Sequence, residues 1–587
     1  MSTTCRLSTC LLTGVLLVGP SVIVGAEGSA PALPGQNTSA TADDLQTSIP
    51  SLIKDARIPG LQVALVRDGR VVWHGNFGVR NATSGEPVTD ETIFEAASLT
   101  KPLFAYYAMM LIDQGLLDLD KPLLGYLSGE YVEKSLGHPL DEKGFHRDWF
   151  EKITTRHVLS HSSGMPHGES GRPLPLFFEP GTKWKYSADG YFLLQKVIET
   201  LKGDKLENLM TKEVLQPLGM TRSCLVWREG YEKTMANGHD FFGTTQDFRK
   251  RTESHAGASL YTTAEDYAKF VCAVLNGEHL GPETLKEMLR PQIDMDKDKG
   301  LGWSLGFGTQ TDDQGLAIWQ WGDYGIFRNY VMAYPAQKSA VVYLTNSFFG
   351  LGVAPELVGQ TIGGRATGSI ALNYRHYDSP VYRAGWAWAG RGPAAAGGPA
   401  GLAEEFPEAF SKDGIEFLCA MFENAGRLGE FVAPLQYYAD AHPQSGKAQF
   451  ALAGALIQAG DRAEAKTYLE KAGKAKEDTV QWSAVKWRLE YVQALEKPKK
   501  LDENHLRRIA GSYGARQLEV RNGQLCYFRK GGSLPEFRPL IAMTEDTFVL
   551  ETLPYFRLRI EFDKNGNPVK AVGIYEDGRQ DETARDK

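Results

Sequence analysis

Apolar and polar positions near the start of the chain follow a strand pattern. Two runs rich in β-branched residues, 62–66 and 71–74, flank the tetrapeptide Arg67-Asp68-Gly69-Arg70. Alternating apolar runs around an Asp-Gly turn predict a β-hairpin. The chain therefore opens its first folded domain with two paired strands.

The pattern then changes to the helical period and later returns to strands. Residues 101–290 mostly repeat their apolar positions at helical spacing, as in 103–117 and 266–275. Strand patterns resume at 317–321, 329–334 and 340–345. This order predicts an α+β fold, with an antiparallel sheet built from both ends of the domain, flanked by helices and interrupted by a helical insertion.

Three further segments follow this domain, which we place at 46–375. Residues 376–403 are rich in Gly, Ala and Pro, and this composition predicts a linker. Residues 404–498 have helical periodicity, and 452–472 resemble one tetratricopeptide helix pair. Because solenoids need several stacked repeats, we expect only a short helical-repeat region. Residues 499–587 alternate apolar and polar positions between Asn-Gly and Asp-Gly turns, which predicts a small antiparallel β-domain.

The N-terminus has the features of a signal peptide. Arg6 precedes an apolar run of 14 residues, 11–24, that ends in small residues before Ala26. The alternative is a membrane anchor, but a spanning helix needs about 20 apolar residues. We therefore expect a signal peptide over 1–26 that is cleaved after Ala26, and a flexible leader over 27–45. The mature protein is then periplasmic or secreted, with no membrane span.

Composition narrows the class of partner. The net charge is −8 without a long single-sign run, and 23% of residues are charged. Nucleic acid and anionic membrane surfaces are therefore not expected partners. Four cysteines remain after signal cleavage, in no paired spacing: Cys224, Cys272, Cys419 and Cys526. We expect no disulfide framework, no metal and no cofactor.

The first candidate for chemistry is Ser98-Leu-Thr-Lys101, an S-x-x-K pattern. Residues three apart lie on one helix face, so the amine can reach the hydroxyl. A serine in the first helical turn also lies near free backbone N–H groups, which can stabilise an oxyanion. The same pattern occurs at 51–54 and 483–486, but only Ser98 follows a small-residue turn at 94–97 and opens a long apolar helix.

Two further segments can complete such a site. Tyr186 lies beside two lysines, and ammonium groups favour its phenolate, so it can share the proton transfer. Residues 319–326 read as a strand that ends in a glycine, which can bring backbone N–H groups close. A competing G-x-S-x-G pattern at 302–306 lacks the helix that a nucleophile elbow requires. His157 and His161 lack the glutamate of a zinc-binding helix, and we interpret them as a helix-start polar cluster.

Five segments carry a resemblance to a known family, in that family's order: Ser98-Leu-Thr-Lys101, 159–166, Tyr186-Ser187, 257–267 and Trp321-Gly-Asp-Tyr-Gly325. Over residues 45–365 the chain resembles the serine hydrolases that include class C β-lactamases, D-alanyl-D-alanine carboxypeptidases, D-aminopeptidases and serine esterases. The resemblance implies a β-lactamase/transpeptidase-like fold and an acyl-enzyme mechanism. It implies Ser98 as nucleophile, Lys101 as base, Tyr186 as second proton-transfer group, and the N–H groups of Ser98 and Ile326 as oxyanion hole.

The sequence departs from the family pattern at two places. Ala188 stands where the family has an asparagine, and Asp323 and Tyr324 stand where it has a Lys-Thr pair. We expect the substrate-binding residues Asp323, Tyr324, Gly325 and Arg328 in this region. Losing a cation and gaining an anion disfavours a substrate carboxylate there.

The predicted function is therefore hydrolysis of an ester or amide, D-amino-acid peptides included, with a small molecule or peptide as substrate. A first alternative is a β-lactamase or penicillin-binding D-alanyl-D-alanine carboxypeptidase. A second alternative is a non-catalytic binding protein. The modules at 404–587 could contact a protein partner in either case.

Overall fold

The computed structural model describes residues 40–127, 146–167, 176–395, 397–530 and 536–586. The described residues form two compact units that meet in sequence between Ser379 and Pro380, close to the domain end expected at 375. The predicted signal peptide and most of the leader lie outside the described residues. Helix α1 (Ala42–Asp55) begins inside the range assigned to the leader, with Thr41 and Asp44 forming a capping box at its start.

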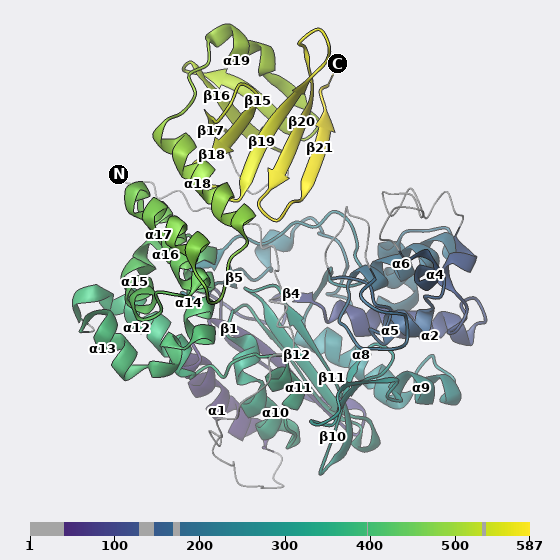
Figure 1. Cartoon of the computed structure of the whole chain (residues 1–587). Helices are drawn as coiled ribbons and strands as arrows, with labels where there is room; N and C mark the ends of the chain where they lie inside the picture. The colour runs from purple at the N-terminus through teal and green to yellow at the C-terminus, as the bar shows by residue number, and fades with distance from the viewer. Residues whose placement is uncertain (1–39, 128–145, 168–175, 396, 531–535, 587) are drawn as a thin grey trace. The chain divides into compact units, whose positions relative to one another are not determined.

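The first unit is built on an antiparallel sheet with the order β3-β2-β1-β13-β12-β11-β10-β9-β8 (Figure 1). Its strands are β1 (Gly60–Arg67), β2 (Arg70–Asn81), β3 (Glu86–Pro87), β8 (Ile293–Asp296), β9 (Leu301–Trp303), β10 (Gly308–Asp312), β11 (Gly315–Asp323), β12 (Arg328–Tyr334) and β13 (Ser339–Thr345). The hairpin of β1 and β2 lies beside β13, the last strand. The prediction that both sequence ends supply the sheet is confirmed.

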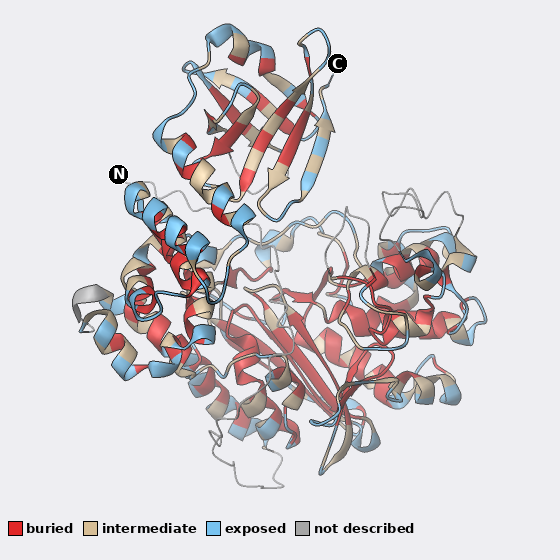
Figure 2. Cartoon of the chain, viewed as in Figure 1, coloured by how far each residue is buried: buried red, intermediate tan, exposed pale blue. Residues whose placement is uncertain are grey.

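Helices cover both faces of this sheet. The described helices of this unit, including those of the helical insertion, are α1, α2 (Thr100–Asp113), α4 (Arg147–Phe150), α5 (Thr155–Leu159), α6 (Asp189–Lys202), α7 (Leu206–Met210), α8 (Ala264–Asn276), α9 (Pro282–Leu289), α10 (Ala354–Ile362) and α11 (Thr367–Ala371). Alternate residues of β1, Ala64 and Val66, share one core with α2 and α8, while Val63 and Leu65 are buried on the opposite face. Figure 2 shows the resulting burial of the strands.

Helix α2 is the central helix of this core. All its residues from Thr100 to Leu111 are buried, because the helix is apolar around its whole circumference. Its first turn adjoins two short strands, β4 (Phe94–Ala97) and β7 (Leu260–Thr262), which pair with each other. A second short pair joins β5 (Gly238–His239) to β6 (Thr245–Gln246).

The second unit begins with helices: α12 (Pro380–Ala395), α13 (Gly398–Glu405), α14 (Lys412–Asn424), α15 (Val432–Ala441), α16 (Gly446–Ala459), α17 (Arg462–Lys474), α18 (Trp482–Glu496) and α19 (Glu503–Ile509). The interpretation of 376–403 as a linker is wrong, since α12 and α13 occupy most of it. Val381, Ala384 and Trp388 are buried, so α12 is anchored, and only Gly392 leaves the helical conformation. Helices α16 and α17 form one hairpin over the predicted pair at 452–472, whereas a tetratricopeptide repeat stays a prediction.

The predicted C-terminal antiparallel β-domain is confirmed. Its strands pair in chain order as β14 (Gly511–Tyr513), β15 (Arg516–Arg521), β16 (Gln524–Arg529), β17 (Arg538–Ala542), β18 (Thr547–Leu550), β19 (Phe556–Phe562), β20 (Pro568–Tyr575) and β21 (Gln580–Ala584). The two ends of the sheet approach each other, because Asp586 N donates to Ser512 O at 2.9 Å and buried Arg516 donates to Thr583 Oγ1 at 2.6 Å. The sheet is thus nearly a barrel. Within the described parts of the chain, no helix is both long and apolar enough to cross a membrane.

Candidate active site

Ser98 lies at the junction between β4 and α2. The preceding residue, Ala97, has a positive φ of 50°, so the chain turns sharply before the serine. Strand β11 passes against this turn at Gly322, where a Cβ atom would lie 2.1 Å from the Ala96 carbonyl oxygen. Only glycine allows this approach. Ser98 itself is half-buried and lies in the turn directly before α2, whose N-cap is Leu99, rather than in the first helical turn that the sequence predicts.

Lys101 is buried one helical turn further on, with an exposed fraction of 1%. Its Nζ lies 3.1 Å from Ser98 Oγ and donates to Gly257 O at 2.8 Å. Burial lowers its pKa from 10.5 to about 7, against a smaller opposing effect of the Asp189 carboxylate. At neutral pH a large fraction of the amine is therefore uncharged and can accept a proton from Ser98.

Tyr186 joins the same cluster. Its hydroxyl hydrogen-bonds to the Ser98 side chain and accepts a hydrogen bond from Gln320 Nε2 at 2.9 Å. Lys101 Nζ lies 4.7 Å from the centre of its ring. Burial raises the pKa of Tyr186 and outweighs both hydrogen bonds, which lower it. The expectation that nearby ammonium groups favour the phenolate is therefore wrong, because the phenol keeps its proton and is suited to donate it.

Gln320 is a site residue that the sequence interpretation missed. It is fully buried, and its Nε2 reaches Ser98 O at 3.2 Å as well as the Tyr186 hydroxyl. Its Oε1 finds no hydrogen-bond partner among the described residues. The segment that meets the serine is thus 320–322, three residues before the one assigned from the sequence. The feature of the sequence that could have located this segment is Gly322, the glycine near the end of β11.

Asp323 and Arg328 do not lie free for a substrate. Asp323 Oδ1 accepts from Gly325 N at 2.5 Å and from Arg328 Nε at 3.1 Å. Arg328 also donates to Phe348 O at 2.7 Å and stacks on the Phe348 ring, 3.8 Å from its centre. Both residues were predicted to bind substrate, but their charged groups hold the turn between β11 and β12.

The other predicted residues of this turn also have defined places. Tyr324 donates to Ala258 O at 2.5 Å, and Gly325 has the positive φ of 77° that the turn requires. Ile326 packs against β5, where a Cβ on Gly238 would lie 2.6 Å from the Ile326 side chain. The carbonyl oxygen of Ile326 accepts from His239 N at 3.4 Å, and a role of its N–H in an oxyanion hole stays a prediction.

Backbone alternation gives a better candidate for the second oxyanion donor. The N–H of Tyr324 donates to Phe327 O at 3.0 Å, toward β12. Because successive N–H groups of a strand point to opposite edges, the N–H of Asp323 points away from β12. It follows Gly322 directly, beside the chain that leads into Ser98.

Three histidines near the cluster are uncharged at neutral pH. The Nδ1 atom of His161 accepts from Ser187 N, and that of His167 accepts from Ala188 N, each at 3.1 Å. Burial lowers the pKa of His161 well below its usual value, that of His167 to about 3 and that of His255 to about 4. They shape the site without adding charge. His157, as predicted, belongs to a helix start, where it completes the capping box of α5.

The other serines considered from the sequence lack this setting. Ser304 of the G-x-S-x-G pattern is buried in the turn between β9 and β10, and its Oγ donates to Phe307 O. Ser51 and Ser483 are exposed on helices. Of the three S-x-x-K matches, only Ser98 is followed by a buried lysine.

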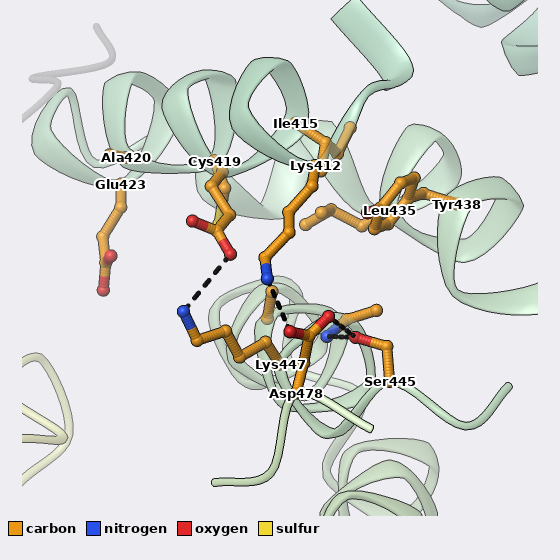
Figure 3. A pocket seen from close by; sticks show the side chains of 13 residues that line it. Lys412, Ile415, Cys419, Ala420, Glu423, Leu435, Tyr438, Ser445, Lys447 and Asp478 are labelled. Atoms are coloured by element: carbon orange, nitrogen blue, oxygen red, sulfur yellow. Dashed lines mark hydrogen bonds and ion pairs between the residues drawn. The ribbon is translucent and has the colours of Figure 1, made fainter. Parts of the chain in front are cut away.

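A separate cavity of about 170 Å³ lies among the helices of the second unit (Figure 3). Its charged side chains pair with one another, Lys412 with Asp478 at 2.5 Å and Lys447 with Glu416 at 3.5 Å. Burial raises the pKa of the Cys419 thiol to about 12, so the thiol stays protonated. This cavity offers no activated nucleophile.

Comparison with known proteins finds similar sequences and solved structures. The model of the family described as Beta-lactamase matches residues 28–358. Esterase EstB of Burkholderia gladioli is 25% identical over 361 residues, which cover 51% of this chain and 88% of EstB. A putative D-alanyl-D-alanine carboxypeptidase of Escherichia coli O157:H7 is 25% identical over 350 residues, 50% of this chain and 79% of the relative. The solved octameric penicillin-binding protein homologue from Pyrococcus abyssi covers 93% of this chain and 100% of its own, at 18% identity and a TM-score of 0.45.

Proposed function

The chain belongs to the beta-lactamase family, and on this premise we propose that it is a serine hydrolase that forms an acyl-enzyme on Ser98 with ester or amide substrates. One observation carries the proposal. Ser98 Oγ lies 3.1 Å from the Nζ of a buried lysine, Lys101, whose pKa is lowered to about 7. A serine hydroxyl beside an uncharged amine is an activated nucleophile.

Acylation then proceeds by proton transfer from Ser98 Oγ to Lys101 Nζ as the oxygen attacks the substrate carbonyl. The negative charge that develops on the carbonyl oxygen is stabilised by the N–H groups of Ser98 and Asp323. The protonated phenol of Tyr186 donates its proton to the leaving alcohol or amine, and Lys101 returns a proton to Tyr186. Water then attacks the acyl-enzyme with the same groups in the reverse roles, which releases the acid and restores Ser98.

The polar groups around the serine favour acyl groups without a carboxylate. Gln320 is a neutral amide, and the guanidinium of Arg328 is engaged by Asp323. The names of two relatives, an esterase and a putative D-alanyl-D-alanine carboxypeptidase, support esters and peptides as substrate classes. Efficient hydrolysis of penicillins, whose carboxylate needs a cation, is not expected.

The test combines covalent labelling with turnover. A fluorophosphonate probe should label the wild type, which should hydrolyse short-chain p-nitrophenyl esters or D-amino-acid anilides, and Ser98→Ala should abolish both. Ser51→Ala and Ser483→Ala are matched controls, because these exposed serines share the S-x-x-K pattern, and they should keep both. Labelling that survives Ser98→Ala would place the nucleophile elsewhere.

Two other outcomes would favour the alternatives. Rapid, Ser98-dependent opening of a chromogenic cephalosporin would favour a β-lactamase, and absence of both labelling and turnover in the wild type would favour a binding protein. Export of the chain, and a protein partner for residues 404–587, stay predictions.

A further inference from the structure

We propose that Tyr374, which lies beyond the segment matched by the family model, is a positioning residue that fixes the Asp323 N–H for the developing oxyanion. The inference rests on the proposed function and adds a residue to it. Tyr374 is not one of the groups that touch the reacting atoms. It acts through the carboxylate of Asp323.

The Asp323 carboxylate is held through both of its oxygens. Tyr374 donates to Oδ2 at 2.7 Å, while Oδ1 accepts from Gly325 N and Arg328 Nε. Burial raises the pKa of Tyr374 well above its usual value, and the nearby Asp323 carboxylate adds a smaller effect in the same direction. The Tyr374 hydroxyl therefore keeps its proton and stays a donor. Hydrogen bonds to a charged acceptor are stronger than those between neutral groups, so these three bonds fix the orientation of the Asp323 carboxylate. The side chain of Asp323 therefore fixes the orientation of its own peptide group.

Tyr374 is itself anchored to the sheet. It follows α11, in which Gly368 packs so closely on Trp319 that a Cβ would lie 2.4 Å from the indole ring. Trp319 belongs to β11, the strand that ends at Asp323. The guanidinium of Arg328 lies 5.3 Å from the centre of the Tyr374 ring. The segment 367–374 therefore contacts β11 at two residues, Trp319 and Asp323.

Tyr324, the next residue of the turn, bonds instead to the segment that holds Lys101. Tyr324 donates to Ala258 O, and the preceding residue, Gly257, accepts from Lys101 Nζ. Loss of the Tyr374 hydroxyl should therefore loosen the oxyanion donor and leave the environment of Lys101 unchanged. A merely structural defect would not separate these two effects.

The test compares Tyr374→Phe with Tyr334→Phe. Tyr334 donates to Asp312 Oδ2 at 2.6 Å, an equivalent Tyr–Asp bond of the same sheet located at the other end of the β10–β12 strands. With a neutral p-nitrophenyl ester, Tyr374→Phe should lower kcat about tenfold while KM stays within about twofold. Binding of an alkylboronic acid, whose tetrahedral adduct places an oxygen in the oxyanion hole, should weaken about tenfold. The pH midpoint of kcat/KM should not move.

Tyr334→Phe should keep wild-type kcat and boronic acid binding, and the thermal unfolding of both variants shows that they fold. Wild-type kcat in Tyr374→Phe, or equal losses in both variants, would overturn the inference and leave the proposed function intact. A shift of the pH midpoint in Tyr374→Phe would also overturn it. An inactive wild type would overturn the proposed function and this inference together.

Discussion

Replacing Lys101 by methionine should make the protein more stable while it removes activity. The side chain is buried, and its pKa falls from 10.5 in water to about 7. At about 1.4 kcal/mol for each pH unit, this difference amounts to about 5 kcal/mol. Burial of the charged form is the cause, so the folded protein bears a cost that an apolar side chain of similar length avoids.

The sign of the pH dependence follows from proton binding. Between pH 7 and 10.5 the unfolded chain keeps the Lys101 proton while the folded protein has lost it, so wild-type stability rises with pH in this window. Below pH 7 both states are protonated and the full cost applies. Losing the amine leaves Gly257 O without its donor, which costs about 1–3 kcal/mol. Lys101→Met should therefore exceed the wild type in stability by roughly 2–4 kcal/mol at pH 6–7, and the difference should shrink or reverse by pH 10.

Urea unfolding at pH 6, 7, 9 and 10 measures this difference in stability. The rate of ester hydrolysis at pH 8 measures the contribution of Lys101 as general base. Activity should fall by about 10²–10⁴-fold, the usual contribution of a general base. Lys54→Met is the matched control, because Lys54 ends an exposed S-x-x-K match in α1, and it should change neither quantity. A variant less stable than the wild type at pH 6, or a stability difference independent of pH, would refute the account of Lys101.

Three further predictions concern the same site. The kcat/KM for a neutral ester should rise with pH to a plateau, with a midpoint near 7, because only uncharged Lys101 accepts the serine proton; a flat profile between pH 5 and 9 would contradict this. Gln320→Lys should shift the ratio of kcat/KM for an anionic ester, such as a succinate half-ester, to that for an acetate ester about tenfold toward the anion, since it places a cation beside Ser98; an unchanged ratio would argue against a role of Gln320 in specificity. Gly322→Ala should lower kcat at least about tenfold and stability by about 1–3 kcal/mol, because its Cβ would meet the Ala96 carbonyl at 2.1 Å, whereas Gly390→Ala, with open space at the Cβ position, should do neither.

The sequence predicts the parts of this fold that periodicity controls. The Asp-Gly hairpin, the three late strands and the central apolar helix follow from local patterns, and each is present. The segment 376–403 was misread because its glycines and prolines suggested a linker. Its alanines form a helix, and the buried side chains of Val381 and Trp388 anchor that helix, which no local pattern could show.

The site divides in the same way. The contact between Ser98 and Lys101 could be predicted because residues three positions apart at a helix start lie on the same face. The segment of β11 that meets Ser98 is 320–322, whereas the sequence indicates 323–325. The approach of Gly322 to Ala96 depends on how two strands distant in sequence are arranged, which no local pattern shows. The state of Tyr186 was misjudged from its lysine neighbours in sequence, whereas burial controls its pKa. Tyr374 carries no motif and could be found only from its contact with Asp323.

The central claim is that Ser98 becomes acylated during turnover. Acid-quenching the enzyme during hydrolysis of a slowly deacylated ester, followed by mass spectrometry of its peptides, tests this claim directly. We expect an added mass equal to the acyl group on the peptide that contains Ser98, and no such mass in Ser98→Ala. An unmodified Ser98 peptide during rapid turnover, or the acyl group on a different residue, would contradict it.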